Sequence, residues 1–272
     1  MMTPARNLTT IPRIQLVAMT SKPEASGNTP DRMKGETMTT FQIQCANIII
    51  EIRCFNDSIK DRCAKYLINS SKSDIIVSPN IGHFNTAKKF MANDNVEDIE
   101  FAAILCDLHE KLIERMACSM HAAVISVDGL GYAFAAQSGV GKTTHINLWK
   151  KRFGDRCEIV NGDKPILTFD NKNVFASGSP WCGKEGFSKN ITVPLKAICF
   201  LERAEVSKIR LLSSNEIIDR LFYQLSIPKQ NTGLTSKCLK IANALIQNIP
   251  FYLLQCNISD EAVKIAYEEM NK

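Results

Sequence analysis

The sequence predicts an α/β protein built on a mixed β-sheet, and three patterns support this. Short apolar runs of strand length alternate with longer segments of helical spacing along most of the chain. One apolar strand leads directly into a glycine-rich loop and then into a helix, which is typical of the parallel part of an α/β sheet. Two pairs of strands, one of which includes this strand, flank short turn sequences, so the sheet should also contain antiparallel hairpins.

Size and composition are those of a globular protein with a sizeable core. The chain has 272 residues, of which 45% are hydrophobic and 22% charged. Its net charge of +5 is scattered along the sequence, so we expect no nucleic-acid partner. No apolar stretch approaches the roughly 20 residues that cross a bilayer, so we expect no membrane partner.

Cysteine usage and the N-terminal segment favour a cytoplasmic location. The 10 cysteines form no CxxC pair, and many lie in apolar runs, as Cys199 does, which predicts buried thiols in a reducing compartment. The first residues lack a compact apolar region followed by a small-residue cleavage site, so no secretion signal is expected.

The chain divides into three predicted parts. Residues 1–40 contain no aromatic residue and are rich in Thr, Pro, Ser and Asn, which predicts a disordered tail. Residues 41–118 are expected to form a small α+β subdomain, and residues 119–272 the main core. In the subdomain we expect strands at 41–55 and 74–77 and helices at 57–68 and 96–116.

In the core, two strands at 122–127 and 132–136 flank Asp-Gly-Leu-Gly, which predicts a β-hairpin. A second hairpin is expected around Asp-Asn-Lys-Asn, and the apolar run at 195–201 should be a central strand. Ser213 and Glu216 form a capping box before a helix. The remaining predicted elements are helices at 143–153, 216–225, 238–247 and 260–270 and strands at 158–160, 164–169, 174–177 and 251–255.

The strongest motif is a phosphate-binding loop of the Walker type at 136–143, in which alanine replaces the usual first glycine. Its small residues allow backbone N–H groups to surround phosphates, Lys142 can reach the outer phosphates, and the Thr143 hydroxyl can hold Mg²⁺. The predicted nucleotide-binding residues are Ala136, Gln137, Ser138, Gly139, Val140, Gly141, Lys142, Thr143, Thr144 and Lys184.

Asp163 and His121 are the candidate catalytic residues beside Lys142. Asp163 follows the strand at 158–160, and a neighbouring parallel strand would carry its carboxylate to the phosphate site, where it could ligate Mg²⁺ or accept a proton. The alternative is that Asp163 is only a turn residue that caps a loop, because Asn-Gly-Asp is also a favourable turn sequence. His121 precedes the first core strand, and the hairpin could return it towards the loop; it could equally be structural. His145 is expected to pack or cap.

The segment from Ser177 to Lys184 is a long loop with turn residues and an aromatic side chain. Lys184 could neutralise phosphate charge, and Trp181 could contact a substrate. The alternative is a tryptophan that anchors a surface loop with a solvated lysine nearby.

These motifs occur in the order that is typical of one family. The matching stretches are 120–123, 136–149, 161–166, 180–184, 193–203 and 252–257. Together they resemble the C-terminal domain of HPr kinase/phosphorylase and the HPr-kinase-like proteins grouped with phosphoenolpyruvate carboxykinase-like folds. The resemblance covers residues 41–272, weakly before Ser119 and strongly after it. It implies a mixed-sheet P-loop kinase core.

The resemblance also implies roles. Lys142 and Thr143 would bind the phosphates of ATP and Mg²⁺, His121 would lie by the reacting phosphate, and Asp163 would be the base and a metal ligand. HPr kinases usually carry two adjacent aspartates at this strand end, whereas Asn161-Gly162-Asp163 supplies one. The HPr-recognition signature is not evident, so HPr is not the expected acceptor. Family members are hexamers, which suggests a homo-oligomer.

The leading hypothesis is an ATP-dependent kinase that phosphorylates a hydroxyl, chiefly serine, on a small protein or peptide. A second hypothesis keeps the site but gives it a small hydroxyl compound such as free serine. A third is a non-catalytic ATP-binding regulator or maturation partner that has lost turnover with the second aspartate. Phosphoenolpyruvate carboxykinase itself is disfavoured, because those enzymes are about twice this length by family resemblance.

Overall fold

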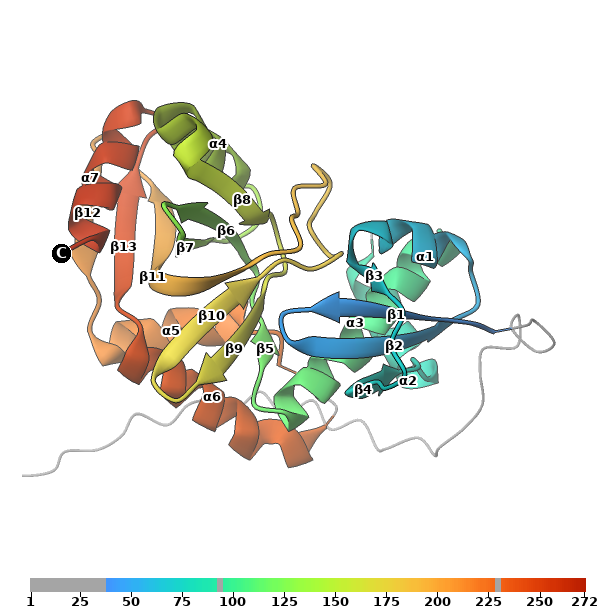
Figure 1. Ribbon diagram of the computed structural model, residues 1–272. Coiled ribbons are helices and arrows are strands. Elements are labelled where there is room, and N and C mark those ends of the chain that lie inside the picture. The colour runs from blue at the N-terminus through green and yellow to red at the C-terminus, as the bar shows by residue number, and fades with distance from the viewer. Residues whose placement is uncertain (1–37, 92–94, 228–230) are drawn as a thin grey trace, which may run out of the picture.

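The structure is a computed structural model, and it describes residues 38–91, 95–227 and 231–272. A large α/β unit lies beside a smaller unit that runs from β1 to α3 (Figure 1). The predicted disordered tail lies outside the described residues except for its last three positions. Of these, Thr39 and Thr40 already belong to β1, so regular structure begins before the predicted boundary at 41.

The large unit is built on a nine-stranded mixed sheet. Its order is β5-β9-β10-β11-β7-β6-β8, and β13 and β12 extend from the second half of β11. The strands are β5 (Cys118–Ser119), β6 (Ala122–Val127), β7 (Leu130–Ala135), β8 (Cys157–Asn161), β9 (Ile166–Asp170), β10 (Asn173–Ser177), β11 (Thr192–Arg203), β12 (Lys208–Leu211) and β13 (Phe251–Cys256). Strands β7, β11 and β13 are parallel, so their carboxyl ends meet at one edge.

Helices cover both faces of this sheet (Figure 1). They are α4 (Lys142–Phe153), α5 (Ser214–Gln224), α6 (Thr235–Asn248) and α7 (Asp260–Met270), with short 3₁₀ turns at Gly154–Arg156 and Thr232–Leu234. Side chains of β7 alternate between the faces: Phe134 packs with Trp149 of α4, and Ala133 belongs to the core shared with α5 and α6. The central strands are therefore buried on both sides.

The small unit has a four-stranded sheet of order β3-β1-β2-β4. Its elements are β1 (Thr39–Cys45), β2 (Ile48–Cys54), α1 (Ser58–Arg62), a 3₁₀ turn (Ala64–Tyr66), β3 (Leu67–Ile68), β4 (Ile75–Val77), α2 (Ile81–Phe90) and α3 (Val96–Glu114). Ile43 and Ile52 pack in one buried cluster with Leu108 of α3. The same cluster includes Ile166 and Trp181 of the large unit, so the two units share a packed contact.

Most predicted elements are present, and three groups of differences have physical causes. The predicted strand at 41–55 is a hairpin, because its alternation of buried side chains continues through a tight turn at Ala46, whose φ is 56°. The predicted helix at 57–68 ends at Arg62, after which the chain tightens into a 3₁₀ turn and enters β3. Helix α2 and strands β5 and β12 were not predicted, since each is short or weakly periodic.

The two predicted core hairpins are confirmed. β6 pairs with β7 across a two-residue turn in which Asp128 and Gly129 have φ of 51° and 83°. β9 pairs with β10, and Asn171 in their turn has a φ of 54°. The capping box of Ser213 and Glu216 is also present. Within the described part of the chain, no helix is long and apolar enough to cross a membrane.

Candidate functional site

The loop from Ala136 to Thr143 joins the carboxyl end of β7 to the start of α4. Gly139 and Gly141 have φ of 80° and 122°, values that side chains with a Cβ rarely adopt. Among the described residues, no side chain caps the start of α4. The first N–H groups of the helix therefore lack their usual partners and are suited to bind an anion.

Lys142, the first residue of α4, reaches back across this loop. Its Nζ donates to the Ala136 carbonyl at 3.0 Å and lies 3.1 Å from Nε2 of His121. Burial lowers the pKa of Lys142, the negative charge of Asp163 opposes this, and the positive charge of Lys164 adds to it. An anion at the loop would replace these contacts with a charge-assisted one.

His121 joins Lys142 to Asp163. Its Nε2 lies 3.2 Å from Oδ1 of Asp163, and the two side chains are 28% and 32% exposed. Burial alone would raise the pKa of Asp163, but the hydrogen bond from His121 and the positive charges of Lys164 and Lys142 hold it below its usual value. Asp163 is therefore a carboxylate at neutral pH.

The backbone also fixes this arrangement. The His121 N–H donates to the carbonyl of Gln224 at 2.7 Å, which ties it to the end of α5. The N–H of Ala122 donates to the carbonyl of Asp163 at 3.0 Å. Both sides of the His121 to Asp163 contact are thus held independently of their side chains.

Strand order differs from the expectation for Asp163. β8 was predicted to lie beside the strand that leads into the loop, but it pairs with β6, and β6 lies between β8 and β7. β8 runs in the same direction as β7 because two antiparallel pairings separate them. Asp163 consequently reaches Lys142 through His121, which directly precedes the intervening strand β6.

Asn161 and Gly162 hold the Asp163 loop and are not ligands. Asn161 is fully buried; its Oδ1 accepts the N–H groups of Asp163 and Lys164 at 2.9 and 2.7 Å, and its Nδ2 donates to the Ser179 carbonyl at 3.0 Å. A Cβ at Gly162 would lie 2.8 Å from the Cys182 carbonyl. No second carboxylate therefore fits between Asn161 and Asp163 without a shift of the facing loop.

That facing loop is anchored to the small unit by Trp181. Trp181 is only 6% exposed, stacks on Phe101 with ring centroids 5.1 Å apart, and donates to the Phe101 carbonyl at 3.0 Å. Of the two alternatives for Trp181, the substrate contact is wrong, because its ring belongs to the core, and the loop anchor is confirmed. Gly183 packs on Asp163, since a Cβ there would lie 3.3 Å from the Cβ of Asp163. Lys184 is exposed on the same turn.

A cleft of about 690 Å³ opens on the other side of the loop, along the carboxyl ends of β11 and β13. Leu148, Leu201 and Ile258 contribute apolar side chains to its lining. Asn257 ties its two rims together, because its Nδ2 donates to the Glu205 carbonyl at 2.7 Å. This cleft was not predicted; the convergence of three parallel strand ends could have indicated it.

Arg203 and Lys164 were also not identified as site residues in the sequence analysis. Arg203 donates from Nε to the Val140 carbonyl at 3.1 Å and from Nη2 to the Gly139 carbonyl. Two signals in the sequence could have indicated them. Arg203 ends the apolar strand, at the edge where ligands bind in such sheets, and Lys164 follows Asp163 directly. His145 is buried, and its Nε2 accepts from Trp149 Nε1 at 2.9 Å. Its predicted packing role is confirmed.

Thr143 and Asp163 are the predicted Mg²⁺ ligands. The described residues contain no group of three or more His, Cys, Asp or Glu side chains that could hold a metal ion by themselves. Mg²⁺ usually takes one or two protein oxygens together with phosphate oxygens and water. A hydroxyl and a single ionised carboxylate are the kinds of protein oxygen that this mode uses.

Comparison with known proteins places the chain in a family. The family model described as "SynChlorMet cassette protein ScmC" matches residues 87–265, about two thirds of the chain. The chain belongs to the ScmC family. The region matched to the ScmC model includes His121, the Ala136–Thr143 loop, Asp163 and Arg203, whereas the first strands of the small unit lie outside it.

No curated protein matches this ScmC family member. Among solved structures, it is similar to the Hpr(Ser) kinase/phosphatase from Coxiella burnetii, with 13% sequence identity and a TM-score of 0.34. The match covers 57% of this chain and 99% of that chain. A TM-score this low does not establish a shared fold.

Proposed function

We propose that this ScmC family protein is an ATP-dependent kinase with a P-loop core of the HPr kinase and phosphoenolpyruvate carboxykinase-like type, which transfers the γ-phosphate to a hydroxyl group. One observation carries the proposal. Lys142 at the start of α4, His121 and the ionised Asp163 form a continuous chain of contacts of 3.1 and 3.2 Å beside a glycine-rich loop. A phosphate-binding cation and a proton acceptor thus lie side by side.

In this proposal ATP binds across the loop. Its phosphates lie against the backbone N–H groups of Gly139 and of Gly141 to Thr143 and against the ammonium group of Lys142. Its base and ribose occupy the cleft of about 690 Å³, where Leu148, Leu201 and Ile258 supply apolar surface. Gln137, Ser138 and Thr144 complete the loop, and the exposed Lys184 neutralises charge from the opposite side.

The reaction is an in-line phosphoryl transfer. The acceptor oxygen forms a bond to the γ-phosphorus, the bond between that phosphorus and the β–γ bridging oxygen breaks, and ADP leaves with the electron pair. The acceptor's proton moves to the carboxylate of Asp163, which is ionised and therefore ready to take it. Lys142 and His121 stabilise charge on the phosphate oxygens.

Mg²⁺ would be held by Thr143 and Asp163 and would neutralise charge on the phosphates when bound. The acceptor in this proposal is a serine hydroxyl on a small protein or peptide in the cytoplasm, with free serine as the small-molecule alternative. The family is described as a cassette protein, so other products of the same cassette are the first acceptors to test. A homo-oligomer is part of the expectation from HPr kinases.

A non-catalytic ATP-binding regulator is the second candidate. It is favoured by the single carboxylate at the end of β8, because buried Asn161 is structural and a side chain at Gly162 would collide with the Cys182 carbonyl. In that case Asp163 serves as a magnesium ligand, and no base remains to activate an acceptor. ATP would bind without transfer.

The experiment is a phosphoryl-transfer assay with Mg²⁺ and γ-labelled ATP. The acceptors offered are HPr, free serine and small peptides encoded beside the gene. Asp163→Asn is the test variant, and Asp128→Asn is the matched control, because Asp128 is an exposed carboxylate on the β6–β7 turn that pairs with Arg156. Label on one acceptor that is lost in D163N and kept in D128N supports a kinase. ATP binding by calorimetry with no transfer supports the regulator.

A further inference from the structure

Arg203 is the last residue of β11, and its side chain crosses from the end of that strand to the loop after β7. Its guanidinium donates to two successive carbonyls, those of Gly139 and Val140. The parallel pairing of β11 with β7 puts the ends of both strands at the same edge, so the contact joins neighbouring strand ends. Because one guanidinium binds two carbonyls, it fixes the orientation of the loop as well as the distance between the loop and the end of β11.

Orientation of these carbonyls decides where the loop's N–H groups point. In a trans peptide the C=O of one residue and the N–H of the next point in opposite directions. Since the Val140 carbonyl faces Arg203, the N–H of Gly141 faces the other way, towards the interior of the loop. The Gly139 carbonyl likewise turns the N–H of Val140 inward, where it bonds the Gln137 carbonyl at 3.3 Å. Arg203 therefore fixes the direction of both peptides, and the N–H of Gly141 is the one that this places for an anion.

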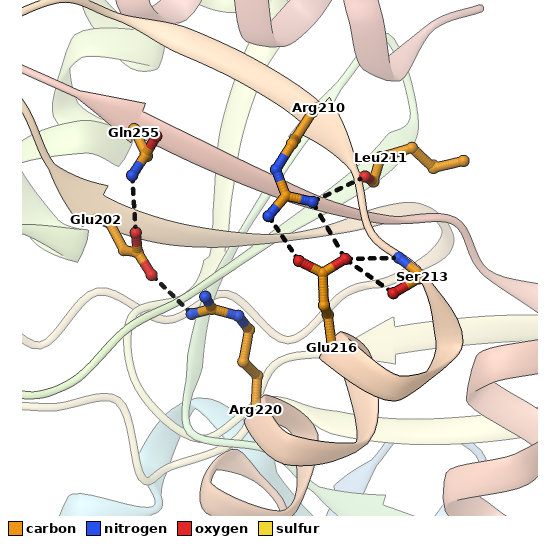
Figure 2. A network of polar contacts seen from close by, with 7 residues as sticks. All are labelled: Glu202, Arg210, Leu211, Ser213, Glu216, Arg220 and Gln255. Carbon is orange, nitrogen blue, oxygen red and sulfur yellow. Dashed lines mark hydrogen bonds and ion pairs between the residues drawn. The ribbon is translucent and has the colours of Figure 1, made fainter. Parts of the chain in front are cut away.

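The strand end that carries Arg203 is itself fixed by Glu202, as Figure 2 shows. Successive residues of a strand point to opposite faces, so Glu202 faces away from the loop. Gln255 of β13 donates to its Oε2 at 3.1 Å, and Arg220 of α5 pairs with its Oε1 at 2.8 Å. Arg210 and Glu216 form a separate part of the network that closes the start of α5 (Figure 2).

We propose that Arg203 is a positioning residue that holds the Ala136–Thr143 loop in its anion-binding shape before a nucleotide arrives. The contacts of Glu202 with Gln255 and Arg220 hold the end of β11, and with it the backbone of Arg203, in place. This inference rests on the proposed function for its consequence, the binding of ATP phosphates, but the contacts of Arg203 with the loop carbonyls involve only atoms of the protein. Lysine at this position would offer one point charge to the two carbonyls and no planar fork.

The experiment compares Arg203→Ala, Arg203→Lys and Arg210→Ala in the full-length protein. Arg210 is a matched control, because it forms an ion pair in the same network but contacts no part of the loop. The first readout is the ¹⁵N order parameter of the Gly139, Val140 and Gly141 amides without ligand. The second is the Kd for MgATP by calorimetry.

We expect R203A to lower the order parameters of these amides and to weaken MgATP binding about five- to tenfold. R203K should fall between R203A and wild type, and R210A should change neither readout. If R203A leaves the order parameters of the loop amides unchanged, Arg203 does not hold the loop. If R203A lowers these order parameters but leaves the Kd for MgATP unchanged, the contact has no role in nucleotide binding. If the wild-type protein binds no MgATP, the proposed function fails, while the order parameters still decide whether Arg203 holds the loop.

Discussion

Nε2 of His121 lies 3.2 Å from Oδ1 of Asp163, although the two residues flank different strands of the large sheet. His121 precedes β6 and Asp163 follows β8, and the antiparallel pairing of these strands puts both at the same end. The contact gives Asp163 a hydrogen-bond donor where burial would otherwise favour its protonated form. Four predictions follow from this site and from the packing around it.

Removing the imidazole should raise the pKa of Asp163. In His121→Ala the hydrogen bond and the charge that lower this pKa are gone, and burial, which raises it, remains. The acid limb of the titration should therefore move to higher pH than in the wild type. ¹³C NMR of the labelled aspartate carboxyl groups measures this without an activity assay. Asp128 serves as the internal control, because its pKa is lowered by Arg156 and should not move.

Lys142→Met should separate binding from stability. Burial already disfavours the charged ammonium group, so its loss should change the free energy of unfolding by less than about 1 kcal/mol. MgATP binding should weaken about ten- to hundredfold, since a charge-assisted contact to phosphate is lost.

Lys150 of the same helix is the control, because its replacement should affect stability and not ATP binding. Its Nζ donates to the carbonyls of Gly154 and Cys157 at 2.9 and 2.6 Å. Lys150→Met should lose about 1 kcal/mol of stability and leave ATP binding unchanged. Urea unfolding and calorimetry measure both effects. Equal ATP affinity in Lys142→Met and the wild type would contradict the assignment of Lys142.

Gly162→Ala should destabilise the protein by about 1–3 kcal/mol, because its Cβ would lie 2.8 Å from the Cys182 carbonyl. The control is Gly129→Asn, since nothing lies within 4 Å of a Cβ there and asparagine tolerates the positive φ of the turn. It should cost less than about 1 kcal/mol. Urea unfolding of both variants tests the packing. Equal stability in Gly162→Ala and the wild type would show that position 162 can accept a side chain.

Stability should fall as pH drops because of His145. Burial lowers its pKa to about 4 from the usual 6.5, so the unfolded chain binds a proton between these values and the folded protein does not. The free energy of unfolding should decrease through this window, by up to about 1.4 kcal/mol per pH unit from this residue. His145→Gln keeps an acceptor for Trp149 and should flatten the slope by that amount. His109, whose pKa is lowered to about 3, keeps part of the slope in the variant. An unchanged slope would rule out His145 as its source.

Local pattern predicted much of the large unit. The Asp128-Gly129 turn, the loop of small residues at 136–143 and the capping box at Ser213 are each set by a few neighbouring residues, and each appears where expected. The hairpin at Ala46 was missed because neither strand pattern nor turn chemistry changes visibly there. For Trp181, a substrate contact and a loop anchor both stayed open, because sequence gives no sign that Phe101 lies beneath it.

The sequence by itself determined the α/β class and the glycine-rich loop with Lys142. It also supplied His121 and Asp163 as side chains that can bind or transfer protons, because these features depend on residue type and local spacing. Tertiary structure alone decided that β6 separates β7 from β8, that Asn161 and Gly162 are structural, and that Arg203 reaches the loop. Strand order and side-chain contact are long-range properties: they depend on which surfaces bury one another, and no short window of sequence contains both partners.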